Sequence, residues 1–180
     1  MGEKLSIHVL RQLISYDPLT GLLTWKRRAR RLFKTERAWA VWNARYAGKA
    51  AFTCIDKNGY CKGSIFDRNY YAHQIAWALK TGKWPKRQID HENHKRSHNS
   101  FGNLNPATNA QNAKNKKKSA FNTSGITGVF FHKKTQKYRA RIEVKGKSIH
   151  LGCFPKIEGA AMARKKAEIK HGFHPNHGAA

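Results

Sequence analysis

The sequence predicts an α+β protein whose short strands and helices precede a small three-stranded antiparallel sheet packed on one helix. Three observations support this class. Apolar and charged residues alternate along residues 137–144, as in a strand with one buried face. Small apolar residues recur at helical spacing along residues 157–170. Between residues 48 and 72, turn-forming Asp and Asn residues separate short strand-like runs.

The first half of the chain alternates short helical and strand-like segments. Apolar side chains lie near helical spacing up to Ser15, and Asp17-Pro18 ends that segment. A later helix is terminated by Gly82 and Pro85. The expected elements are a helix at 5–15, a turn before an apolar run at 22–25, short strands that include 60–66, and a helix at 72–80.

The second half begins with a strand candidate and ends with the sheet and its helix. A helix with Pro106 near its first turn is expected up to about Lys117. The expected elements are a strand at 88–94, a helix at 106–117, strands near 126–131, 137–144 and 147–154, and a helix at 157–170. The expected organisation is a first domain at 1–118, a linker at 119–124, a second domain at 125–173 and a tail at 174–180.

The charge balance points to a polyanionic partner. Lys and Arg number 36 against 10 Asp and Glu, a formal net charge of +26. No carboxylate lies between Glu92 and Glu143. No apolar run approaches the roughly 20 residues of a membrane span, and three cysteines argue against a disulfide-built secreted domain. With 39% hydrophobic residues the chain can still bury a core. We expect a soluble, cytosolic nucleic-acid-binding protein.

Asp90-His91-Glu92 stands out because carboxylates are so scarce around it. Cleavage of a phosphodiester needs a base that activates water and a cation that neutralises the developing charge. A hard cation such as Mg²⁺ prefers carboxylate and amide oxygens. These three residues alone favour the alternative, a structural histidine beside an aspartate that balances nearby lysines.

The stretch IDHENHKRSHNSFGNLNPATNAQNAKN, residues 89–115, resembles the HNH nucleases and their ββα-metal fold. The resemblance extends to YYAHQIAWALKTGKWP and YDPLTGLLTW upstream, and it places the core motif at 84–118. It implies that His91 is the general base and that Asp90 and Asn112 bind one divalent cation, Mg²⁺ or alternatively Mn²⁺. It also implies that Asn103 holds the hairpin and orients His91 by hydrogen bonding.

The sequence departs from this family in the loop after His91. Many relatives read Asn-Gly-Asp where this chain has Asn93-His94-Lys95, and Asp-Asn where it has His98-Asn99. The extra histidines leave open a zinc site that would add two cysteines, although these lack the paired Cys-x-x-Cys spacing of structural zinc. The cysteines in question are Cys54 and Cys61.

Residues 122–173 resemble the sheet-plus-helix DNA-binding domain of plant ethylene-response factors, on SGITGVFFHKKTQKYRARIEVKGKSIHLGCF and EGAAMARKKA. In that family the outward side chains of the sheet meet the major groove. Arg139 and Arg141 are the expected base readers, because arginine can donate two hydrogen bonds to guanine. The alternative is a basic face that binds the backbone without sequence preference. The expected DNA contacts are His132, Lys134, Arg139, Arg141, His150, Lys114, Lys116 and Lys117.

Together the two resemblances imply a homing-type DNA endonuclease of phage or mobile-element type. The implied partner is double-stranded DNA, with no membrane and no small-molecule cofactor, and a monomer is favoured. The implied location is the cytoplasm, in the bacterial host if the protein is phage-encoded. Two alternatives stay open: a non-catalytic DNA-binding or regulatory protein, and a structural RNA-binding protein.

Overall fold

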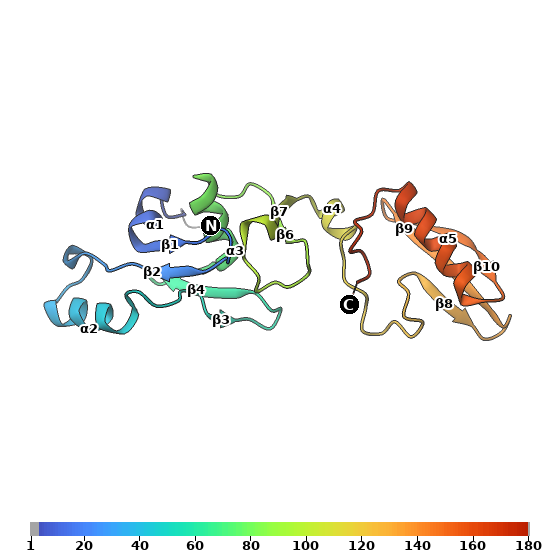
Figure 1. Cartoon of the computed structure of the whole chain (residues 1–180), viewed down its shortest axis with the longest axis horizontal. Coiled ribbons are helices and arrows are strands. Elements are labelled where there is room, and N and C mark those ends of the chain that lie inside the picture. The colour runs from blue at the N-terminus through green and yellow to red at the C-terminus, as the bar shows by residue number, and fades with distance from the viewer. Residues whose placement is uncertain (1–3, 180) are drawn as a thin grey trace. The chain divides into compact units, whose positions relative to one another are not determined.

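The computed structural model describes residues 4–179 and divides into two compact units, Met1–Ala107 and Thr108–Ala180 (Figure 1). The division precedes the segment 119–124 that the sequence suggested as a linker. The domain limits drawn from the sequence stay a prediction. Within the described residues, no helix has the length and apolar character needed to cross a membrane.

The first unit opens with a helix that runs directly into a two-stranded sheet. Ser6 caps the helix by accepting a hydrogen bond from the Val9 amide at 3.3 Å. Leu10, Leu13 and Ile14 are fully buried and form part of the core of this unit. The elements are α1 (Ile7–Leu13), β1 (Ile14–Tyr16) and β2 (Leu23–Trp25), with β1 and β2 antiparallel.

A second small sheet packs with α3 on the same core. Ile65 and Ile75 are fully buried in it, as expected for a strand and a helix that share a core. The predicted helix at 72–80 is confirmed, and it ends at Gly82, which adopts a left-handed conformation. The elements are β3 (Cys54–Ile55), β4 (Cys61–Ile65), β5 (Arg68–Tyr71) and α3 (Ala72–Thr81), with strand order β3-β4-β5.

The elements that were not expected from the sequence include η1 (Arg30–Leu32) and α2 (Glu36–Tyr46). Asn43 is the one buried residue of α2, and its side chain bonds to the backbone of Arg28. Trp42 of the same helix packs against the core of the unit, with its ring centroid 5.7 Å from that of Trp25. The helix is therefore held by one buried amide and by half-buried aromatic side chains rather than by a continuous apolar stripe, which is why its apolar periodicity is weak.

The hairpin that carries the HNH-like motif follows α3. It comprises β6 (Gln88–His91), η2 (Phe101–Asn103) and the antiparallel β7 (Leu104–Ala107). The helix expected at 106–117 is wrong in length and start. Pro106 pairs with Ile89 in the hairpin, and the five-residue helix α4 (Asn109–Ala113) begins only after Thr108. Thr108 and Gln111 form a capping box, which fixes this later start.

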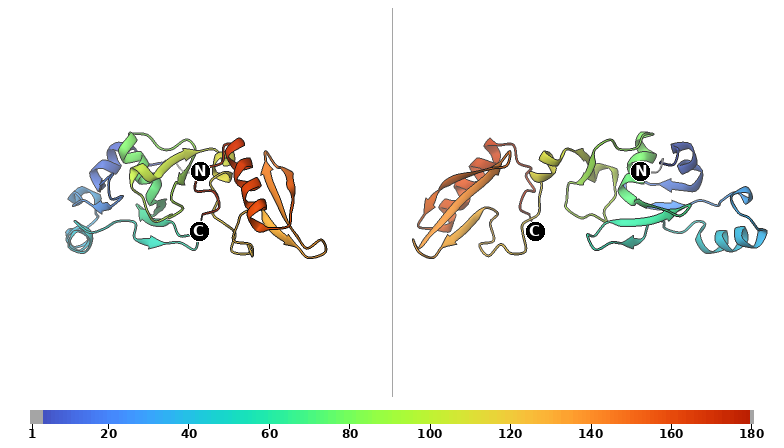
Figure 2. Two further views of the ribbon diagram at one scale, coloured as in Figure 1. Left: turned by 45° about the vertical axis from the view of Figure 1, so that its right-hand side comes forward. Right: turned by 180° about the vertical axis from the view of Figure 1, so that it is seen from behind.

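The second unit is a three-stranded antiparallel sheet with one helix across one face (Figures 1 and 2). The predicted strands at 137–144 and 147–154 and the helix at 157–170 are confirmed at their bounds. Val129, Ala140 and Ala160 form the buried contact between sheet and helix. The elements are β8 (Val129–His132), β9 (Lys137–Val144), β10 (Lys147–Phe154) and α5 (Ile157–Lys170), with order β10-β9-β8.

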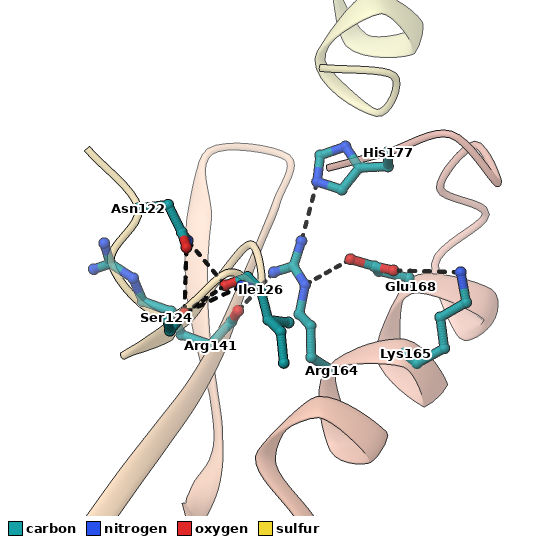
Figure 3. Close-up of polar contacts among 8 residues, drawn as sticks. All are labelled: Asn122, Ser124, Ile126, Arg141, Arg164, Lys165, Glu168 and His177. Carbon is teal, nitrogen blue, oxygen red and sulfur yellow. Dashed lines mark hydrogen bonds and ion pairs between the residues drawn. The ribbon is translucent and has the colours of Figure 1, made fainter. Parts of the chain in front are cut away.

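A buried arginine ties α5 to the sheet and to the C-terminal segment (Figure 3). The Arg164 guanidinium pairs with Glu168 at 2.8 Å, donates to the Arg141 carbonyl at 2.6 Å and meets His177 Nε2 at 3.2 Å. The segment expected as a tail is therefore bonded to the rest of this unit over its described residues. Cys153 is exposed rather than packed between sheet and helix, because the bulge after His150 shifts the register of β10.

At Gly21 the backbone of the β1–β2 turn packs closely against the loop before η2. Gly21 has a positive φ of 81°, and a Cβ atom there would overlap the backbone of Asn99 and Ser100. Gly48 has a similar φ of 78°, but a Cβ atom there would meet nothing within 4 Å. A comparison of alanine substitutions at Gly21 and Gly48 therefore separates the free-energy cost of the left-handed backbone conformation from that of a steric clash.

We expect Gly21→Ala to destabilise the first unit by more than Gly48→Ala. Each change places alanine in the left-handed region, at a cost of about 1–2 kcal/mol, and the clash at Gly21 adds about 1–3 kcal/mol. Tryptophan fluorescence during chemical denaturation measures the difference, because all 5 tryptophans lie in the first unit. Equal losses for the two variants would contradict a close approach at Gly21.

Candidate functional site

The β6–β7 hairpin presents Asp90 and His91 at the end of β6. Asp90 is paired with Asn105 and His91 with Leu104 across the hairpin. Ile89 and His91 are buried while Asp90 is half-buried, as the alternation of a strand requires. The two functional candidates therefore lie on opposite faces of one strand.

His91 is held by a hydrogen bond to a neighbouring loop. Its side chain is only 3% exposed, and its Nε2 lies 3.2 Å from Oδ1 of Asn99. The Asn99 amide nitrogen donates to the Ser97 carbonyl at 3.1 Å, so its oxygen is the atom directed at the imidazole. Because an amide oxygen only accepts, Nε2 carries the proton.

Asn99 is fixed from the N-terminal part of the chain. The Tyr16 hydroxyl donates to the Asn99 carbonyl at 2.8 Å, and the Phe101 amide donates to the Pro18 carbonyl at 2.8 Å. Asn99 itself is 5% exposed. Burial and the neighbouring Asp17 raise the pKa of Tyr16 to about 12, so the hydroxyl remains a donor. The β1–β2 hairpin thus positions the partner of His91.

Asn103 has the expected role in the hairpin loop but not the expected role at His91. Its amide nitrogen donates to the His98 carbonyl at 2.7 Å, and its oxygen accepts from the Asn93 amide at 3.0 Å. These bonds close the loop. The prediction that Asn103 orients His91 by hydrogen bonding is corrected, because that bond comes from Asn99.

A second histidine packs against His91 in an aromatic pocket. The ring centroids of His73 and His91 are 5.3 Å apart at an interplanar angle of 84°. Tyr60 lies 5.1 Å from His73 and 5.8 Å from His91, and Tyr71 stacks on His73 at 5.5 Å. His73 is 7% exposed, and its Nδ1 is buried without a hydrogen-bond partner.

This pocket keeps both imidazoles neutral. Burial, and secondarily the adjacent His91, lowers the pKa of His73 to about 4. Burial also lowers the pKa of His91, although the bond to Asn99 and the charge of Asp90 act in the opposite direction. Near pH 7, His91 is therefore unprotonated at Nδ1 and can accept a proton there.

The two residues expected to bind a metal are Asp90 of β6 and Asn112 of α4. No cluster of three or more His, Cys, Asp or Glu side chains that could hold a metal occurs within residues 4–179. Cys54 is exposed and Cys61 half-buried. Asn112, the second expected ligand, lies half-buried in α4 of the other unit. That Asp90 and Asn112 hold one cation stays a prediction.

The outer face of the second unit's sheet, opposite α5, gathers most of the expected DNA-binding residues. Cross-strand pairs are formed by Arg141 with His150, by Arg139 with Phe130, and by Lys137 with His132. Residues directly opposite in an antiparallel pair project from the same side of the sheet. The Arg141 guanidinium lies 5.6 Å from the ring of Phe130. Four predicted contacts, His132, Arg139, Arg141 and His150, therefore share one face.

The expected lysine contacts divide into two groups. Lys114 donates from Nζ to the His171 carbonyl at 2.6 Å, which favours a structural role for this side chain. Lys116, Lys117 and the turn residue Lys134 are exposed.

Sequence reasoning missed Asn99, His73 and Tyr60 as neighbours of His91. In the sequence, Asn99 stood out only as a departure from the family pattern. His73 was one histidine within the helix expected at 72–80. The loop departure at His94 has a structural correlate, since His94 adopts a positive φ of 62° where many relatives carry glycine. The signal in the sequence that could have identified Asn99 is an asparagine that departs from the family pattern in the loop after His91, the candidate base.

Comparison with known proteins gives one match. The family model described as HNH endonuclease matches residues 70–114. No curated protein and no solved structure matches the chain. The match supports an HNH nuclease, for which DNA is the implied substrate, and it covers α3, the hairpin and α4.

We expect the first unit to lose stability as the pH falls from 7 to 5. His73 has a folded pKa of about 4, so the unfolded chain binds a proton from about pH 6.5 downward and the folded chain does not. The stabilisation is complete above about pH 6.5 and decreases by about 2 kcal/mol at pH 5. Denaturant unfolding followed by tryptophan fluorescence measures this, and His73→Phe should flatten the dependence. Identical slopes for both proteins would contradict the assignment to His73.

Proposed function

We propose that this protein is a metal-dependent DNA endonuclease in which His91 is the general base and Asp90 and Asn112 hold a divalent cation. The HNH match over residues 70–114 and the net charge of +26 support DNA cleavage. The observation that carries the role of His91 is the hydrogen bond between its Nε2 and Asn99 Oδ1 at 3.2 Å.

That hydrogen bond selects the tautomer a base needs. With the proton on Nε2, the lone pair of the imidazole is on Nδ1. Removal of a proton from water at Nδ1 makes His91 an imidazolium, whose Nε2–H bond to Asn99 strengthens as the charge develops. The ring needs no rotation during this step, because Tyr60 and His73 already pack against it.

The residues proposed as ligands fit Mg²⁺. One carboxylate and one amide oxygen are few ligands, and Mg²⁺ commonly retains several waters and takes one or two carboxylates. A divalent cation bound by Asp90 and Asn112 would neutralise charge on the scissile phosphate and on the leaving oxygen. The scarcity of other carboxylates supports a specific task for Asp90, because an acid repels the phosphate backbone.

The outer face of the second unit's sheet is proposed to select where the DNA is cut. Arg139 Nε is buried without a hydrogen-bond partner, and such a donor gains free energy when a bound acceptor reaches it. Arg141 is exposed, while its backbone is fixed by bonds to Gly128 and Arg164. A fixed backbone with an exposed guanidinium, supported by the ring of Phe130, suits bidentate recognition of guanine.

The wild-type protein is expected to nick or cut supercoiled plasmid DNA with Mg²⁺ or Mn²⁺ and not in the presence of a chelator. His91→Ala should reduce the single-turnover cleavage rate about 100- to 10,000-fold, because general-base catalysis contributes that much. Binding of duplex DNA, followed by fluorescence anisotropy in chelator, should change less than about twofold. The exposed His8 provides a matched control, since His8→Ala should retain full activity.

Two further variants separate the base from a packing role. Asn99→Ala should slow cleavage because the tautomer of His91 is no longer fixed. Asn99→Asp keeps the acceptor and raises the pKa of His91, so the acid limb of the pH–rate profile should move to higher pH. Combined loss of DNA binding and cleavage in His91→Ala would assign His91 a structural role instead.

Arg141→Ala is expected to relax the choice of cleavage site. A bidentate arginine–guanine contact discriminates by about 1–3 kcal/mol, so preference between the best site and its single-base variants should fall about 10- to 100-fold. Sequencing of the ends produced on a long duplex measures this preference. Lys137→Ala, on the same face, is the control and should weaken binding evenly across sequences. An unchanged site distribution in Arg141→Ala would favour backbone binding alone.

A further inference from the structure

Residues 26–49, which we call the basic arm, form a peripheral part of the first unit that the HNH match does not cover. They include η1 and α2, and α2 lies at the edge of this unit in the different views (Figures 1 and 2). The arm contains one acidic residue, Glu36, and nine cations. The cations are Lys26, Arg27, Arg28, Arg30, Arg31, Lys34, Arg37, Arg45 and Lys49.

The arm has a fixed internal structure. The Arg28 amide donates to Asn43 Oδ1 at 2.8 Å, and the Arg28 carbonyl accepts from Asn43 Nδ2 at 3.2 Å and from Trp39 Nε1 at 2.8 Å. Thr35 caps α2 by accepting from the Ala38 amide at 3.1 Å. The arm is thus a defined element of the first unit rather than a solvated basic tail.

The tryptophan side chains of the arm pack against arginines of the same arm. The Arg28 guanidinium lies 3.8 Å from the ring of Trp42, 5.0 Å from Trp25 and 5.5 Å from Phe66, and Arg28 is 8% exposed. Arg27 lies 5.0 Å from the ring of Trp39. Cation–π contacts of this kind hold the tryptophans against arginines of the same unit.

The outward surface of α2 is cationic. Arg37, Val41, Ala44 and Arg45 recur at helical spacing and are exposed, Val41 by 58%. The single acid, Glu36, is paired with Arg30 at 2.6 Å, which leaves the other exposed cations of the arm without an acidic partner inside it. Small side chains between arginines allow close approach of a polyanion.

We propose that the basic arm docks on the sugar–phosphate backbone of duplex DNA, outside the segment that is cut. This inference rests on the proposed function for the identity of the polyanion. A membrane surface is disfavoured because interfacial helices direct tryptophan outward, whereas Trp39 and Trp42 are half-buried against arginines. Arg31, Arg37 and Arg45 make the phosphate contacts, and Arg28 holds the arm in shape.

The test measures DNA binding by a triple variant, Arg31→Gln, Arg37→Gln and Arg45→Gln. It uses the full chain with His91→Ala, in chelator, and a fluorescent duplex of random sequence at several salt concentrations. Each lost phosphate contact lowers the magnitude of the salt slope by about 0.9, so a decrease of about 2–3 is expected, with affinity at least about tenfold weaker at 0.1 M salt. Tryptophan fluorescence confirms that the arm is folded.

A matched triple variant of exposed lysines, Lys156→Gln, Lys166→Gln and Lys170→Gln, removes the same charge elsewhere. If the salt slope and the affinity decreased equally in both triple variants, the effect of the arm would be explained by net charge alone, and the proposal would be overturned. Unchanged DNA binding with lost binding to phosphatidylglycerol vesicles would assign the arm to membranes. This assay measures binding and involves no cleavage. If the wild-type protein binds DNA through the arm but does not cut it, only the assignment as an enzyme is refuted.

Discussion

The hydrogen bond between His91 and Asn99 is the constraint on which the candidate site depends, and it is not local to the hairpin. Asn99 is placed by Tyr16 and by the close approach of Gly21, both in the β1–β2 hairpin. The HNH match begins only at residue 70. The N-terminal segment therefore belongs to the site physically, since it fixes the acceptor that sets the tautomer of the proposed base.

The large positive charge is compatible with folding because several cations are consumed internally. Arg28 is enclosed by aromatic rings, while Arg164 and Lys114 donate to backbone carbonyls of their own unit. The hydrogen bonds and the Glu168 carboxylate around Arg164 offset part of the desolvation penalty of its buried charge, whereas burial lowers the pKa of Arg28 to about 10. The cations that remain on the outer face of the sheet and on the basic arm are those free to meet phosphate.

The parts of the fold predicted from sequence are those that local patterns determine. Alternation along residues 137–144 and helical spacing along 157–170 gave β9 and α5 with their bounds. The helix at 106–117 was mispredicted because the pairing of Pro106 with Ile89 is a tertiary contact. The helix α2 was missed because its one buried residue is the polar Asn43 and its other packing comes from half-buried tryptophans. Within the candidate site, Asp90, His91 and Asn103 were proposed from the family resemblance, whereas Asn99 and His73 come next to His91 only through folding.

The second unit has a structural relation to the motif as well as a proposed role in DNA selection. The HNH match ends at residue 114, beyond the boundary at Thr108, so α4 belongs to the second unit. The segment after α4 is tied to the C-terminal residues by bonds from His174 to the Lys114 carbonyl and from Gly178 to the Lys116 carbonyl. A helix of five residues is not stable alone, so these contacts and its capping box sustain it. The second unit therefore stabilises α4, the helix that carries Asn112.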